Sequence, residues 1–120
     1  MEEHLYHYKA KVLRVVDGDT IDVIIDVGFA MSFGNESAPQ RLRLNRINAP
    51  ESRTRNLEEK ARGIAAKEYL IQFLLDHRME VILKTHKDDA FGRWLSDVYC
   101  GDICVNDHLV FKGHAVYKEY

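Results

Sequence analysis

The sequence predicts a mainly β domain of the α+β class, built either as a small sheet with helices or as a five-stranded barrel that carries helices. Residues of alternating polarity mark three strands before residue 48 and two more after residue 79. One long helical pattern separates these two groups of strands, and a short helical pattern follows the second group. The regular alternation of strands and helices that a doubly wound parallel sheet requires is absent.

The first three strands follow one another closely along the chain. Strands are predicted from Lys9 to Val16 and from Thr20 to Val27, and a tight hairpin turn at Asp17-Gly18 joins them. A loop from Gly28 to Pro39 leads to the third strand, which is predicted from Gln40 to Ile47.

The third strand carries an unusual amount of positive charge. Leu42 and Leu44 share one face of it, so Arg41 and Arg43 must point to the other face. From Arg41 to Arg62 there are seven basic and three acidic residues, although the net charge of the whole chain is −2. The chain is therefore no general polyanion binder, and its positive charge is concentrated in one segment.

The second half of the chain begins with the most clearly predicted helix. Asn56, followed by Glu59, resembles a capping box, and the apolar residues after it recur at helical spacing. These residues are Ala61, Ala65, Ala66, Tyr69, Leu70, Phe73 and Leu74. Two strands, Glu80 to Thr85 and Trp94 to Cys100, then flank a polar connection, and a short helix from Val105 to Lys112 ends at Gly113.

Length and composition predict one domain. The chain has 120 residues, of which 46% are hydrophobic, so residues 9–120 suffice for a single core, with a flexible segment at 1–8. The first residues lack the basic start and apolar run of a signal peptide, and no stretch reaches membrane-spanning length, which predicts a cytoplasmic protein. Cys100 and Cys104 do not have the spacing of a redox or zinc motif, so both are predicted to be reduced.

Four oxygen-bearing side chains could meet if the strands of the first hairpin and the third strand are neighbours. Asp17 and Asp19 lie at the first hairpin turn, and Asn48 and Glu51 follow the third strand. Carboxylate, amide and backbone oxygens are the ligands of hard cations such as Ca²⁺ or Mg²⁺. Taken alone, the Asp-Gly pair is also the ordinary choice for a purely structural hairpin turn.

Two arginines add a feature that a structural turn does not need. Arg43 precedes the carboxylates closely, and Arg93 ends a glycine-containing turn before a strand. A planar guanidinium can bind phosphate oxygens in a bidentate manner and stabilise the charge that develops during phosphoryl transfer, although a single arginine is more often a surface ion-pair partner. Together with a metal and a carboxylate base, two arginines would suit phosphodiester hydrolysis.

Five fragments, in order from about Lys9 to Ala115, resemble the staphylococcal nuclease (thermonuclease) family. They are Asp17-Gly18-Asp19-Thr20, Arg41-Leu42-Arg43-Leu44, Ala49-Pro50-Glu51, Phe91-Gly92-Arg93, and the Val105-Asn106, Leu109-Val110, Gly113 and Ala115 pattern. The resemblance implies an oligonucleotide-binding-type barrel with packed helices and a calcium-dependent nuclease that cuts DNA and RNA with little sequence preference.

The resemblance also implies roles for individual residues. Asp19, Asn48 and the backbone carbonyl of Ala49 would bind Ca²⁺, with Mg²⁺ or Mn²⁺ as alternative ions. Glu51 would be the general base that acts on water, and Arg43 and Arg93 would bind the scissile phosphate. The products would end in a 3′-phosphate. The predicted partners are DNA or RNA, preferably single-stranded. The oligomeric state is left open between a monomer and a weak homodimer, and the family analogy suggests an intracellular nuclease of a bacterium or its virus.

The chain departs from the family pattern at several positions. Asn48 replaces the usual aspartate, which removes one negative charge and predicts weaker calcium binding and reduced activity. Ala90 and Phe91 stand where lysine and tyrosine are common, and the chain stops at Tyr120, so the last helix of the family is predicted to be missing. Two alternatives to an active nuclease therefore remain: a catalytically weak nucleic-acid-binding module and a scaffold domain on the same fold.

Overall fold

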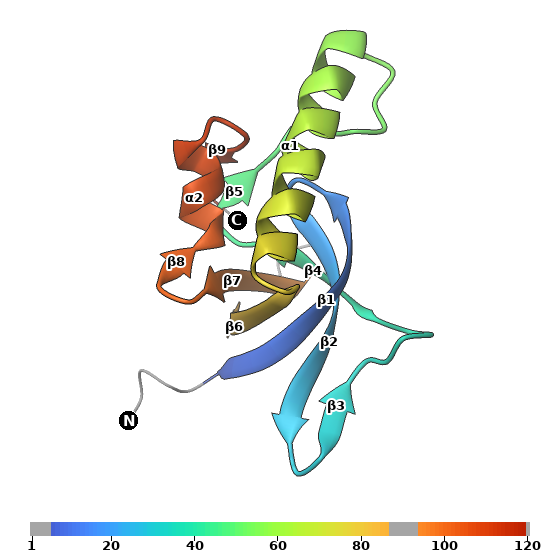
Figure 1. The fold of residues 1–120 in the computed structure, drawn as a ribbon. Helices are drawn as coiled ribbons and strands as arrows, with labels where there is room; N and C mark the ends of the chain where they lie inside the picture. The colour runs from blue at the N-terminus through green and yellow to red at the C-terminus, as the bar shows by residue number, and fades with distance from the viewer. Residues whose placement is uncertain (1–5, 87–93, 120) are drawn as a thin grey trace.

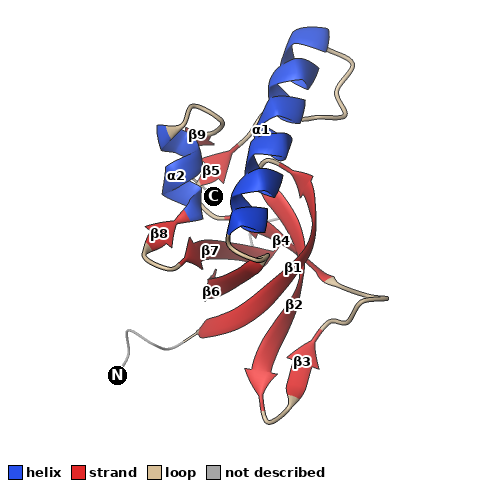
Figure 2. Cartoon of the chain, in the orientation of Figure 1, coloured by secondary structure: helices blue, strands red, loops and turns tan. Residues whose placement is uncertain are grey.

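The computed structural model describes residues 6–86 and 94–119, which form a five-stranded β-barrel with two helices packed on it (Figure 1, Figure 2). The elements are β1 (His7–Asp17), β2 (Thr20–Gly28), β3 (Met31–Phe33), β4 (Gln40–Leu44), β5 (Ile47–Asn48), α1 (Leu57–Asp76), β6 (Glu80–His86), β7 (Trp94–Cys100), β8 (Ile103–Cys104), α2 (Val105–Phe111) and β9 (Val116–Tyr117). The pairings β1–β2, β2–β4, β4–β7, β7–β6 and β6–β1 close the barrel, and only β4–β7 is parallel among these five. The predicted five-stranded barrel with packed helices is confirmed.

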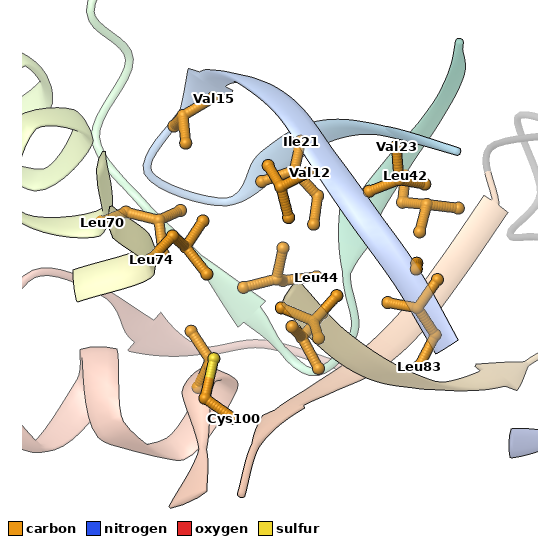
Figure 3. Packing of buried hydrophobic residues seen from close by; sticks show 14 of the residues in the cluster. Val12, Val15, Ile21, Val23, Leu42, Leu44, Leu70, Leu74, Leu83 and Cys100 are labelled. Atoms are coloured by element: carbon orange, nitrogen blue, oxygen red, sulfur yellow. The ribbon is translucent and has the colours of Figure 1, made fainter. Parts of the chain in front are cut away.

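The barrel encloses the core that the alternating pattern predicts. Ile21 and Val23 of β2 and Leu42 and Leu44 of β4 are each at most 2% exposed. Their side chains meet inside the barrel in Figure 3, where they contact residues from β1 and β6. Because side chains alternate along a strand, the polar residues of β2 and β4 lie on the outer wall.

The connection between β2 and β4 differs from the prediction. In place of a plain loop from residue 28 to residue 39, β3 pairs with the end of β2, with Phe33 opposite Ile25 and Met31 opposite Gly28. The two residues of this turn, Phe29 and Ala30, have φ angles of 56° and 58°. Such turns are normally marked by asparagine or glycine, so the sequence carries no signal for this hairpin.

The predicted third strand is also shorter than expected. It ends at Leu44, and Arg46 adopts a φ of 67° that breaks the extended conformation. The chain then resumes as β5, whose Ile47 pairs with Tyr117 of β9. This break separates Asn48 from the barrel strand, so it lies in a small second sheet.

Helix α1 begins and packs largely as its sequence predicts. The Asn56 side chain accepts hydrogen bonds from the backbone N–H groups of Glu58 and Glu59, both at 3.1 Å. Leu70 and Leu74 extend from α1 into the core (Figure 3), whereas two of the alanines at helical spacing, Ala61 and Ala65, are exposed. The helix therefore covers one end of the barrel with its leucine face.

Helix α2 is fixed by one buried polar residue. Asn106 is fully buried, its side-chain oxygen accepts from the Val98 N–H at 2.9 Å, and its amide nitrogen donates to the Asn45 carbonyl at 2.8 Å. These bonds join α2 to β7 and to the turn after β4. None of the helices within the described ranges has the length and apolar character needed to cross a membrane.

Candidate active site

The turn between β1 and β2 lies against the end of β4, which is the arrangement that the predicted site requires. The Leu44 N–H donates to the Asp19 carbonyl at 2.8 Å, and Thr20 is opposite Arg43 in the pairing of β2 with β4. Residues from 19 to 20 and from 43 to 49 are therefore brought to one place on the barrel wall. Four of the residues predicted to form a site meet there: Asp19, Arg43, Asn48 and Ala49.

Asp19 provides the carboxylate at the centre of this site. The residue is 4% exposed, and its Oδ1 accepts from the Thr20 hydroxyl at 2.9 Å. Its Oδ2 accepts from the backbone N–H of Ala49 at 2.9 Å. These bonds fix the carboxylate in orientation and join the first hairpin to the segment after β5.

Arg43 bridges Asp19 and Asn48. Its Nη2 lies 3.1 Å from Oδ2 of Asp19 and donates to Oδ1 of Asn48 at 2.6 Å. The Arg43 side chain is only 15% exposed, so both contacts are largely shielded from water. One guanidinium nitrogen thus neutralises the carboxylate and also contacts the amide oxygen that the sequence assigns to a cation.

Glu51 lies on a segment that is held between the first turn and α1. The next residue, Ser52, donates from its backbone N–H to Oδ1 of Asp17 at 3.3 Å, and its hydroxyl also donates to that oxygen. On the other side, a Cβ built on Gly63 of α1 would lie 2.3 Å from the Glu51 carbonyl oxygen. The backbone of Glu51 is therefore fixed, while the residue is exposed to solvent.

Sequence analysis missed the residues that hold Glu51 in place. Ser52 is buried and Gly63 is the only glycine in α1, and neither is among the predicted site residues. An isolated glycine inside a strong helical pattern is a signal of close packing, and this signal could have identified Gly63. Nothing comparable in the local sequence marks Ser52.

The site offers oxygen ligands of the kind that hard cations bind, but only a few of them. Within residues 6–86 and 94–119, no three His, Cys, Asp or Glu side chains gather in a way that could hold a metal. The candidate set is one carboxylate from Asp19, one amide oxygen from Asn48 and a backbone carbonyl from Ala49, all oxygen ligands of the type that Ca²⁺ and Mg²⁺ take. Arg43 contacts the first two, so a cation that uses both oxygens must compete with it.

A hollow lies beside Asn48 and Ala49. It has a volume of about 350 Å³ and is lined by Asn48, Ala49, Pro50, Glu59, Arg62 and the residues from Gly113 to Val116. A larger cavity of about 640 Å³ lies on another part of the barrel wall, among residues of β1, β2, β3 and β6 such as Lys9, Asp26 and Ile82. Because none of the site residues line it, the smaller hollow is the one relevant to Asn48.

Arg93 lies outside the described residues, and its predicted place in the site stays a prediction. The next residue, Trp94, is opposite Leu42 at the start of β7, and Leu95 is opposite Arg43. The two predicted thiols are confirmed, because Cys100 and Cys104 are both free. Burial raises the pKa of the Cys100 thiol to about 11, which makes it a poor nucleophile.

The outer wall next to the site carries a second polar group. Asp22 is 1% exposed and forms ion pairs with both Arg14 and Arg41. The hydrogen bond from Arg41, opposed by desolvation, lowers the pKa of Asp22 below its usual value. Asp22 was not among the predicted site residues.

Taken together, the barrel and its arginine–carboxylate site define a nuclease-like domain. The chain belongs to the family described as "Staphylococcal nuclease homologue", whose model matches residues 41–120. It is 29% identical over 110 residues to a thermonuclease of Staphylococcus hyicus and 32% identical over 109 residues to a thermonuclease of Staphylococcus intermedius. It is also 34% identical over 92 residues to a micrococcal nuclease of Shigella flexneri. The resemblance predicted from the sequence is confirmed.

These relatives are longer than the chain. The matches cover 92% and 91% of the chain for the two thermonucleases and 77% for the micrococcal nuclease. They cover 59%, 59% and 42% of the relatives themselves. The chain thus spans about half the length of the curated relatives that it matches.

Proposed function

We propose that this protein hydrolyses phosphodiester bonds in DNA or RNA with little sequence preference. The observation that supports this most directly is the position of Arg43, a shielded guanidinium held by Asp19 and Asn48. The segment that carries Glu51 is bonded to the same hairpin through the backbone N–H groups of Ala49 and Ser52. Family membership and the thermonuclease relatives agree with this activity. A low sequence preference is expected of a site that recognises phosphate groups and not base edges.

In the proposed reaction, Glu51 takes a proton from a water molecule. The resulting hydroxide attacks phosphorus, one bridging P–O bond breaks, and the leaving oxygen is protonated from solvent. Arg43 and Arg93 stabilise the negative charge that develops on the phosphate oxygens. The fixed backbone of Glu51 supports this role because a general base must be held in register with the water that it activates.

We further propose that Asp19, Asn48 and the Ala49 carbonyl hold a divalent cation, Ca²⁺ in the first place and Mg²⁺ or Mn²⁺ as alternatives. When bound, such a cation supplies charge stabilisation for the phosphate and lowers the pKa of water. Without substrate, the Nη2 group of Arg43 donates to the Asn48 amide oxygen. When substrate binds, the same Nη2 group can donate to a phosphate oxygen instead. With an amide in place of a second carboxylate, we expect calcium binding to be weak.

A nucleic-acid-binding module without efficient catalysis is the second candidate function. It is favoured by the 2.6 Å bond from Arg43 to Asn48, which occupies a predicted cation ligand. The two functions share the phosphate-binding arginine and differ only in turnover. A single experiment can therefore separate them.

The test is cleavage of a labelled single-stranded oligodeoxynucleotide in Ca²⁺, Mg²⁺, Mn²⁺ or chelator. We expect cleavage with a cation, loss of cleavage with chelator, and a fall of about 100-fold or more in kcat for Glu51→Gln. The matched control is Glu80→Gln, which changes an exposed glutamate on β6 and should leave kcat unchanged. Absence of cation-dependent cleavage would refute the enzyme, and binding that strengthens as salt falls would then identify the module.

Substrate preference and assembly are proposals that the same preparation can test. We propose a preference for single strands and a monomeric or weakly dimeric state. Competition between single-stranded and duplex DNA, and between DNA and RNA, measures the first. Sedimentation velocity over a range of protein concentrations measures the second.

A further inference from the structure

A row of three charged residues crosses the outer wall of the barrel next to Arg43. Arg14 of β1 is opposite Asp22 of β2, and Asp22 is opposite Arg41 of β4. All three side chains lie on the outer face, because their neighbours Val15, Val23 and Leu42 are buried in the core. Two cations and one anion leave this row with a net positive charge.

The two arginines share one buried carboxylate. Arg41 donates from Nε to Oδ1 of Asp22 at 2.9 Å and from Nη2 to Oδ2 at 3.2 Å. Arg14 donates from Nε to the same Oδ2 at 2.5 Å. Because Asp22 is 1% exposed and hydrogen-bonded by both guanidinium groups, it fixes their positions relative to each other.

Part of each guanidinium remains available to a ligand. The side chains of Arg14 and Arg41 are 64% and 58% exposed. Among the residues that the structure describes, no hydrogen bond uses the two Nη groups of Arg14 or Nη1 of Arg41. A single arginine would neutralise the charge of Asp22, so the carboxylate alone does not require the second one.

The row lies one step along β4 from the proposed site of hydrolysis. Arg41 and Arg43 are two residues apart on the same strand and point to the same face, which separates their backbones by about 7 Å. Arg43 is opposite Thr20, and Arg41 is opposite Asp22, the next outward-facing residue of β2. A nucleic-acid strand that places one phosphate at Arg43 can extend along the wall to the row.

We propose that Arg14 and Arg41, held in place by Asp22, form a second phosphate subsite that binds the phosphate adjacent to the scissile one. This proposal rests on the proposed function, in which Arg43 binds the scissile phosphate. It predicts that the substrate is a chain with at least two consecutive phosphates. A substrate with a single phosphodiester cannot reach both Arg43 and the row.

Binding tests the subsite without requiring turnover. Arg14→Gln and Arg41→Gln are each made in the Glu51→Gln background, so that one arginine always remains to pair with Asp22. With a fluorescent oligothymidylate in chelator, each substitution should weaken binding at low salt by about tenfold. Each should also reduce the slope of log K against log salt by about 0.7, the value for one phosphate contact to a single strand.

Two further variants and one further measurement show whether the loss of binding is specific to the subsite. Lys84→Gln removes an exposed cation from β6, which pairs with neither β2 nor β4, and should change neither the affinity nor the slope. Arg41→Lys keeps the charge and should restore the slope. Thermal unfolding of each variant detects a structural role: a lower Tm with an unchanged salt slope would overturn the subsite.

Hydrolysis assays use the background that keeps Glu51. They distinguish a failure of the second phosphate subsite from a failure of the proposed nuclease function. Arg41→Gln should lower kcat/KM on the oligonucleotide by about tenfold and on thymidylyl-thymidine, which has one phosphodiester, by less than twofold. Equal losses on both substrates would overturn the subsite and leave the nuclease intact. If the wild-type protein cleaves neither substrate, the proposed function fails, and the salt slope of binding still decides the subsite.

Discussion

Gly63→Ala probes the contact between α1 and the segment that carries Glu51. Gly63 is buried, and a Cβ at this position would lie 2.3 Å from the Glu51 carbonyl oxygen and 2.6 Å from the Ser52 nitrogen. Both neighbours are backbone atoms, so no side chain can rotate out of the way. To reach ordinary van der Waals contact, which begins at 3.4 Å, the Glu51 segment must move by about 1 Å.

The effects on stability and on activity should differ in size. Alanine gains about 1 kcal/mol over glycine inside a helix, while the overpacking costs about 1–3 kcal/mol. Displacement also strains the bonds from Ser52 to Asp17. The net of these two effects is a fall of about 0–2 kcal/mol in the free energy of unfolding, and the strained bonds add to this fall. A misplacement of about 1 Å in a reacting group can lower the rate by about 100-fold.

The assay is cleavage of a labelled single-stranded oligonucleotide, measured together with thermal unfolding. Ala65→Gly serves as the control, because Ala65 is exposed on the same helix and its replacement changes helix propensity without a clash. It should lower stability by about 1 kcal/mol and leave kcat/KM unchanged. A Gly63→Ala protein with kcat/KM within twofold of the wild type would show that this contact does not position Glu51.

Three other outcomes follow from the structure. Asn48→Asp adds a carboxylate beside Arg43, so the calcium midpoint in calorimetry should fall by about tenfold or more, and an unchanged midpoint would contradict the assigned ligand. Because the pKa of Asp22 is lower in the folded protein, its ion pairs stabilise the fold fully above the unfolded carboxyl pKa of about 3.9. This stabilisation is lost as the pH falls through the pKa that Asp22 has in the folded protein. Melting curves from pH 5 to pH 2 should therefore decline less steeply for Asp22→Asn, which is less stable at pH 7, than for the wild type. The pKa of the Cys100 thiol is raised to about 11, so little thiolate is present at pH 8 in the folded protein. In the Cys104→Ser variant, maleimide should therefore label Cys100 at least about 100-fold more slowly in the folded protein than in the unfolded chain. Comparable labelling rates would refute the burial of Cys100.

The largest differences between expectation and structure have a common local cause. Residues Phe29, Ala30 and Arg46 all adopt positive φ, although none of them is glycine or asparagine. Sequence reading assigns such conformations to glycine and asparagine, so it missed β3 and placed the end of β4 too late. Tertiary contacts override local preference at these positions. One such contact is at Arg46, whose backbone carbonyl accepts a hydrogen bond from the Lys118 N–H at 2.7 Å.

The sequence by itself determined the five strands of the barrel, the long helix and the candidate residues. Alternation along β2 and β4 reports which side chains face the core, and Asn56 marks the start of α1, because both signals depend on neighbours within a few residues. For the same reason, the short motifs around Asp19, Arg43 and Glu51 could be recognised without knowledge of their spatial arrangement.

Only the tertiary structure decided how these residues act on one another. The bridge from Arg43 to Asp19 and Asn48 depends on the register between β2 and β4 and on the break after Leu44. The position of Glu51 depends on Gly63, which is distant in sequence and approaches through the packing of α1. Strand register and helix packing arise from contacts between separated segments, and such contacts leave no periodic trace in either segment alone.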